Sequence, residues 1–157
     1  MTLRYCFEQD RLYLSGENEC GQTIKLWLTL RLLSKLVPNL LLRLHGENSV
    51  PSNMPDLSSD DSESKKHSDD TSVLCAPGSP EALVTSIVLE FATDHLILIF
   101  KDAASAELAS LALSTDSLLI WTRGLQKCFE TAGWPLAAFV PKGAESIVRT
   151  AEAVTIH

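Results

Sequence analysis

The apolar positions of the chain fall into two successions, each with three short runs that favour strands and one longer run that favours a helix. Polar residues separate the short runs of the first succession, which lie at 3–7, 11–14 and 23–28. In the third run Ile24, Leu26 and Leu28 share one face, because successive side chains of a strand point to opposite sides. The first succession therefore predicts three strands.

The longer run that follows them predicts an amphipathic helix of about fifteen residues. Thr29 is a suitable N-cap, because its hydroxyl can accept a hydrogen bond from an unpaired backbone N–H, and Gly46 ends the helix. Pro38 falls on the polar face and is expected to kink the helix there. At about 100° per residue, the apolar arc holds Leu30, Leu33, Leu36, Val37, Leu40, Leu41 and Leu44.

The second succession repeats this order. Ser114 or Thr115 is expected to cap its helix, and Gly133 to end it. Its three strands and its helix are expected at 84–91, 95–101, 107–113 and 116–132.

The two successions also match residue by residue, which predicts an internal duplication. Eleven pairs preserve the order of elements, the first turn and the helix cap. At a spacing of 84, Phe7, Asp10, Leu12 and Leu14 coincide with Phe91, Asp94, Leu96 and Leu98. At a spacing of 85, Leu26, Leu28, Thr29, Leu33, Leu36, Leu40 and Leu44 coincide with Leu111, Leu113, Ser114, Leu118, Trp121, Leu125 and Phe129.

These patterns divide the chain into two units, 1–46 and 81–133, each with three strands and a helix. The segment 47–80 is acidic and rich in serine and proline, which predicts a disordered linker. The extension 134–157 has no counterpart in the first unit, and within it 147–156 fits a strand or a short helix. Units of under fifty residues are marginal alone, so both are expected to share one core. The predicted fold is two-layer α+β, an antiparallel sheet of about six strands with two helices on one face.

Composition supports a folded protein whose charge is unevenly placed. The chain is 45% hydrophobic and carries a net charge of −7. The segment 45–82, which contains the linker, holds eight acids and two bases, so its net charge is −6 and that of the rest of the chain is −1. Residues 1–9 lack the apolar core of a secretory signal, and 27–44 contains three basic residues that are costly in a bilayer. We therefore expect a cytoplasmic protein, with free thiols at Cys6, Cys20, Cys75 and Cys128.

No pattern in the sequence indicates catalysis. Cys128 falls on the apolar arc of the second helix, where a thiol is expected to be buried and inert. The glycines do not form a phosphate-binding loop, and a metal site needs ligands that converge. The histidines are dispersed along the chain, at His45, His67, His95 and His157. We therefore expect no enzyme activity, cofactor, metal or small-molecule substrate.

Basic residues on the first helix are the first candidate for binding. Arg31, Lys35 and Arg43 share its polar face, where they could neutralise phosphates or acidic side chains. The chain outside the linker is nearly neutral, and we find no interleaving of aromatic and basic residues of the kind that nucleic-acid binding favours. Nucleic acid is therefore the second choice of partner.

Leucines outside the apolar arcs are the second candidate. Leu32 and Leu42 lie outside the arc of the first helix, and Leu119 and Ile120 lie outside that of the second. Exposed apolar side chains that gather into a patch indicate an interface. We therefore expect a non-catalytic protein–protein interaction module, such as an adaptor, assembly factor or scaffold subunit, that binds a protein partner or a second copy through its helix surfaces. The alternative is a nucleic-acid-associated protein that uses the basic face of the first helix.

Overall fold

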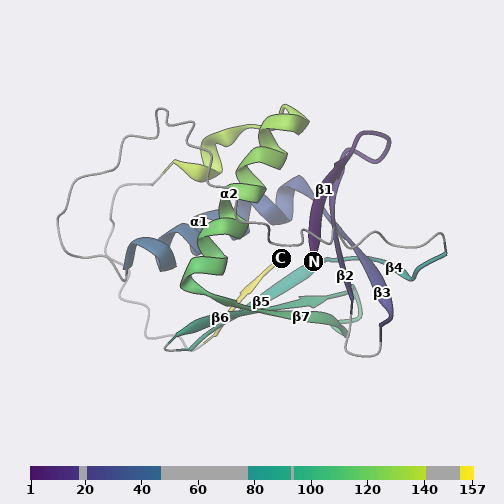
Figure 1. Ribbon diagram of the computed structural model, residues 1–157, viewed down its shortest axis with the longest axis horizontal. Coiled ribbons are helices and arrows are strands. Elements are labelled where there is room, and N and C mark those ends of the chain that lie inside the picture. Colours follow the sequence, from purple (N-terminus) through teal and green to yellow (C-terminus); the bar gives the residue numbers. More distant parts are fainter. Residues whose placement is uncertain (18–20, 47–77, 93, 141–152) are drawn as a thin grey trace, which may run out of the picture.

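The computed structural model describes residues 1–17, 21–46, 78–92, 94–140 and 153–157. Both predicted β-β-β-α successions are present, and three further short elements accompany them (Figure 1). The strands are β1 (Thr2–Cys6), β2 (Arg11–Glu17), β3 (Thr23–Leu28), β4 (Glu81–Leu83), β5 (Ser86–Phe91), β6 (His95–Lys101), β7 (Glu107–Ser114) and β8 (Ala153–Ile156). The helices are α1 (Leu30–Gly46), α2 (Thr115–Ala132) and the short 3-10 helix η1 (Leu136–Phe139).

The strands form two four-stranded sheets, not the single sheet of about six strands predicted from the sequence. The first, sheet A, has the order β1-β2-β3-β4, and the second, sheet B, has the order β7-β6-β5-β8. All neighbouring strands are antiparallel except β3 and β4, which are parallel. Each predicted triplet keeps a sheet of its own, and a strand distant in sequence completes it. The α+β class is confirmed.

The two helices begin and end where the sequence predicts. The Thr29 hydroxyl accepts a hydrogen bond from the backbone N–H of Leu32 at 3.3 Å, and the Ser114 hydroxyl accepts one from Ser117 at the same distance. Gly133 follows α2 in the left-handed conformation, with φ at 67°, which glycine adopts without steric cost. Pro38 lies inside α1. Among the described residues, no helix is both long and apolar enough to cross a membrane.

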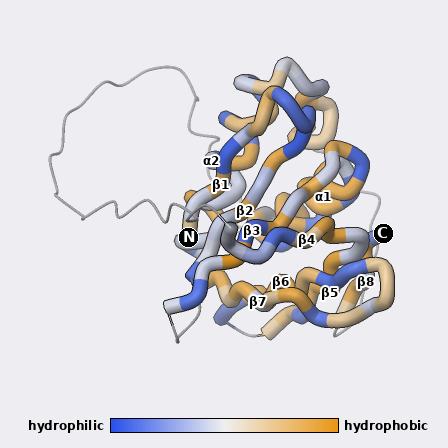
Figure 2. The backbone as a smooth tube through the Cα atoms, turned by 90° about the vertical axis from the view of Figure 1, so that its right-hand side faces the viewer, coloured by the Kyte–Doolittle hydropathy of each residue, from blue (hydrophilic) through white to orange (hydrophobic). Residues whose placement is uncertain are grey.

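The helices lie in the angle between the two sheets, with sheet B along the bottom of Figure 1 and sheet A to the right. Leucines from both sheets and both helices form one core. The packing crosses between the units: α2 lies beside β1, and α1 lies beside β8. Figure 2 shows α2 and β7 on one side of the molecule and α1 and β8 on the other.

Leu32 was expected outside the core, and that expectation is wrong, because its side chain is only 2% exposed. A helix that packs on a single sheet buries one arc, but α1 also contacts α2, η1 and β8. These neighbours widen the buried arc beyond the one predicted from hydrophobicity. Leu33, Leu36, Val37 and Leu40 are buried as predicted.

The predicted linker, 47–80, lies outside the described residues except for its last three. Pro80 accepts a backbone hydrogen bond from Lys25 at 2.9 Å, and the hydroxyls of Ser79 and Thr23 lie 2.7 Å apart. These contacts lead into β4, so the end of the predicted linker is hydrogen-bonded to β3. In the C-terminal extension, β8 pairs with β5, so the strand alternative for 147–156 holds at 153–156.

Candidate interaction surfaces

Three of the four apolar residues predicted to form an interface are exposed. The side chain of Leu42 on α1 is 66% exposed, and those of Leu119 and Ile120 on α2 are 40% and 69% exposed. Leu32 is removed from the predicted interface by its burial. Of the three that remain, Leu119 and Ile120 are adjacent on α2, and Leu42 is on α1.

The basic residues predicted on α1 are in part committed to contacts within the chain. The Lys35 ammonium donates to the backbone carbonyl of His157 at 2.5 Å. The Arg43 guanidinium donates to the backbone carbonyl of Ala92 at 2.9 Å. Arg31 is exposed. Two of the three cations thus fasten α1 to residues that directly follow β8 and β5 of sheet B, which gives them a structural role.

The outer surface of α2 contains a feature that the sequence reasoning overlooked. Gly124 is exposed in the middle of the helix, and a Cβ added to it would meet nothing within 4 Å. It lies one helical turn after Ile120 and one turn before Lys127, so the three line one stripe. Glycine in a helix interior costs about 0.5–1 kcal/mol relative to alanine. We call Leu119, Ile120, Arg123, Gly124 and Lys127 the α2 surface.

The outer face of sheet A carries a cation–aromatic cluster, although no such interleaving was found in the sequence. The Tyr13 and Trp27 rings meet edge to face with centroids 5.5 Å apart. The Lys25 ammonium lies 4.1 Å from the Trp27 centroid and 4.9 Å from that of Tyr13. The sequence signal that could have revealed this cluster is the alternation of side chains along two strands. It places Tyr13, Lys25 and Trp27 on outward positions.

Glu81 completes this cluster and attaches β4 to β3. Its carboxylate accepts a hydrogen bond from the Trp27 indole at 2.9 Å and pairs with the Lys25 ammonium at 3.2 Å. The indole hydrogen bond, and then the one from Lys25, lower the pKa of Glu81. Because Lys25 already lies over the rings, the cluster holds the sheet together and offers no bare stacking platform to a base.

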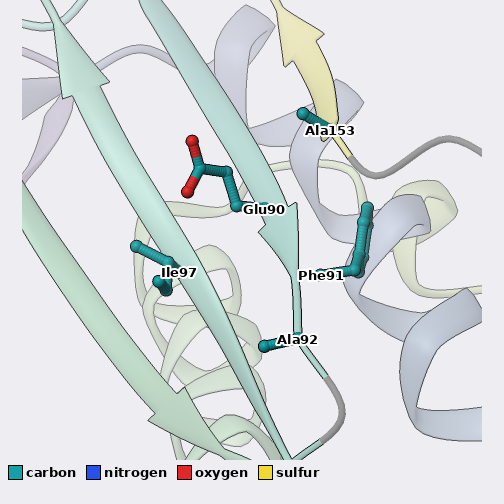
Figure 3. Close-up of a pocket in the computed structure, with 5 residues that line it drawn as sticks. All are labelled: Glu90, Phe91, Ala92, Ile97 and Ala153. Carbon is teal, nitrogen blue, oxygen red and sulfur yellow. The ribbon is translucent and has the colours of Figure 1, made fainter.

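A shallow hollow lies on the outer face of sheet B (Figure 3). Glu90 lies directly opposite Ile97 on one side and Ala153 on the other, and Phe91 and Ala92 complete the lining. Glu90 is the one ionisable group among these five residues. Acid–base catalysis needs several convergent polar groups, so this lining provides no catalytic constellation.

Asp10 connects the β1–β2 turn to the segment after α2. One of its carboxylate oxygens accepts hydrogen bonds from the Tyr5 hydroxyl at 2.7 Å and from the Trp134 indole at 3.0 Å. The Tyr5 hydrogen bond, and then that from Trp134, lower the pKa of Asp10. Its backbone has a φ of 47°, a left-handed conformation that Asp tolerates better than most residues.

Asp10→Asn is expected to reduce stability at pH 7 and to weaken the loss of stability in acid. Because the folded-state pKa is lowered, the carboxylate stabilises the fold above the unfolded-state pKa of about 4, and this contribution disappears as the pH falls through the folded-state value. Urea unfolding of both proteins from pH 7 to about pH 3 tests this. The difference between them should shrink toward low pH, and a constant difference would contradict the role of the charge.

The described cysteines and histidines form no reactive or metal-binding group. Cys6 and Cys128 are free thiols, and burial raises the pKa of Cys128, as expected for an unreactive thiol. Cys20, Cys75 and His67, and the side chain of His45, lie outside the described parts of the chain. Within those parts, no three metal-ligating side chains cluster.

No protein-family model, curated protein or solved structure matches the chain.

Proposed function

We propose that the protein is a non-catalytic protein–protein interaction module, an adaptor, assembly factor or scaffold subunit, that binds its partner through the α2 surface. The observation that carries this proposal is Ile120, whose side chain is 69% exposed and lies beside the exposed Leu119. Leaving large aliphatic side chains in water forgoes roughly 25 cal/mol per Å² of apolar area. Their burial by a partner would recover that free energy.

Gly124 supports the same surface by a separate argument. Its helical conformation needs no glycine, since only a positive φ would require one, and a Cβ there would meet no atom of the chain. Alanine would therefore make α2 more stable without a clash. A bare backbone beside Ile120 instead allows the main chain of a partner to approach the helix closely.

The charges of the α2 surface indicate the chemistry of the partner. Arg123 and Lys127 are exposed on either side of Gly124. A partner that inserts an apolar side chain against Ile120 and places carboxylates near these two cations would be complementary to the surface. We propose an acidic protein partner for this site, in the cytoplasm, where Cys6 and Cys128 would remain free thiols.

Gly124→Ala is expected to raise stability while weakening partner binding. The free energy of unfolding should increase by about 0.5–1 kcal/mol, because alanine is the better helix former. Ile120→Asp should abolish binding, since it places a charge in the buried centre of the interface. Urea unfolding measures the first effect, and quantified capture of partners from native lysate measures the second.

Leu42→Asp is the matched control, because Leu42 is as exposed as Ile120 but lies on α1. It should capture the same partners as the unmodified protein. Equal capture by Ile120→Asp and the unmodified protein would show that the α2 surface is not the binding site. Loss of binding in Leu42→Asp alone would show that the binding site is on α1 and not on α2.

The nucleic-acid alternative receives less support. Lys35 and Arg43 are hydrogen-bonded to backbone carbonyls, so a phosphate would have to compete with these contacts. Salt-dependent retention on heparin that is lost in Arg31→Gln would favour this alternative.

We also infer that the two β-β-β-α units arose by duplication. Both triplets are antiparallel meanders followed directly by a helix. Several equivalent positions are both buried, including Leu12 with Leu96 and Leu28 with Leu113. The equivalent residues Thr29 and Ser114 both cap helices.

A further inference from the structure

β7 forms a long edge of sheet B. β7 has eight residues, and in the described parts of the chain it pairs with β6 alone. The other three edge strands are shorter, because β1, β4 and β8 have five, three and four residues. Short edges are one way in which proteins avoid unwanted strand pairing. β7 lacks that protection.

The unpaired backbone groups of this edge can be assigned from the hydrogen bonds of β6. His95 accepts from Ala92 at 3.0 Å and Lys101 accepts from Thr85 at 2.9 Å, so their carbonyls point toward β5. Backbone groups of successive residues in a strand point to alternate sides. The backbone N–H and C=O groups of Leu98 therefore point toward β7.

The register of β6 with β7 then fixes the direction of the groups in β7. Leu111 lies opposite Leu98, and Ile99 and Ile97 lie opposite Ser110 and Ala112. Leu111 therefore directs its backbone groups toward β6. Ser110 and Ala112 direct their N–H and C=O groups outward, where they can pair with another strand.

The side chains of β7 do not oppose such pairing. From Leu108 to Leu113 the strand contains no charged residue and no proline, and Glu107 stands at its start. Ser110 and Ala112 are small and exposed. Charges and prolines are the usual protection of an edge strand, and the middle of β7 has neither.

We propose that β7 pairs antiparallel with β7 of a second copy, which joins the two copies of sheet B into one eight-stranded sheet. A two-fold axis through the middle of the strand makes the pairing self-complementary. It places the two Glu107 carboxylates at opposite ends of the pair, so that no like charges face each other. An axis perpendicular to the sheet keeps the helices of both copies on the same face, and the cores remain continuous.

This inference is independent of the proposed function, because it concerns a different surface and a different partner. A second copy is favoured over a foreign peptide because β7 satisfies the pairing rules with itself. The side chains opposite one another across a two-fold axis through Leu111 are small or aliphatic, and cross-strand pairs of that kind stabilise a sheet.

The test is the mass of the full chain in solution, measured by sedimentation from micromolar to millimolar concentration. The unmodified protein should change from 17.2 kDa to twice that mass. Ala112→Pro removes an outward N–H and should remain at the single-chain mass, because proline is tolerated on the free side of an edge strand. Ala112→Ser keeps the N–H and should associate as the unmodified protein does.

Ala112→Lys provides a second test if the proline variant does not fold by circular dichroism, because a charge on an edge also prevents pairing. Ile120→Asp should leave the dimer intact, which distinguishes this contact from the α2 surface. A single-chain mass for the unmodified protein at every concentration would overturn the proposal. Dimers of equal affinity in Ala112→Lys would overturn it as well.

Discussion

Phe129→Ala is expected to lower the free energy of unfolding by about 3–5 kcal/mol, the range for removing a fully buried aromatic side chain. The Phe129 side chain is 0% exposed. Its ring meets those of Trp134 and Phe139 edge to face, each with centroids 5.2 Å apart. The substitution therefore removes the central ring of the cluster that holds η1 against α2.

Urea unfolding followed by circular dichroism measures this cost, and Ile120→Ala is the control on the same helix. Ile120 is mostly exposed, so its truncation should change stability by no more than about 0.5 kcal/mol. Tryptophan fluorescence should also shift in Phe129→Ala, because Trp134 loses a neighbouring ring. Equal costs for the two variants would mean that the buried face of α2 is assigned incorrectly.

Leu32→Ala and Leu36→Ala are both expected to cost about 2–5 kcal/mol, as for other buried leucines. The two side chains are 2% and 0% exposed. The burial of Leu36 agrees with the expectation from the sequence, and the burial of Leu32 contradicts it.

Leu42→Ala is the control for this pair, since its side chain is 66% exposed on the same helix. Thermal or urea unfolding of the three variants distinguishes the orientation of α1 in the structure from the orientation predicted by hydrophobicity. A small cost at Leu32 with a large cost at Leu36 would restore the helix orientation predicted from hydrophobicity, and would contradict the packing of α1 described here.

The elements were predictable because their signals are local. Alternation marked the strands, and Thr29, Ser114 and Gly133 marked helix ends through contacts with residues three or four positions away. The sheets were not predictable in the same way. The parallel pairing of Lys25 with Glu81 joins residues far apart in sequence, and no local pattern specifies such a partner.

The candidate surface was predicted only in part for the same reason. Leu119 and Ile120 lie outside the apolar arc of one helix, which periodicity can detect. The burial of Leu32 depends on several neighbours of α1 that the sequence does not locate. The sequence did not single out Gly124, because the empty space around it becomes visible only when the neighbouring elements are in place.

The crossed packing of the two units has a consequence for how the chain tolerates change. β4 precedes β5 in the sequence but completes sheet A, and the helix of each unit lies against an edge strand of the other sheet. Neither 1–46 nor 78–157 can therefore bury its apolar surface alone. We therefore expect the two halves to unfold as a single cooperative unit, in one transition. Neither half is expected to fold without the other, so a substitution in the core of one half should destabilise both.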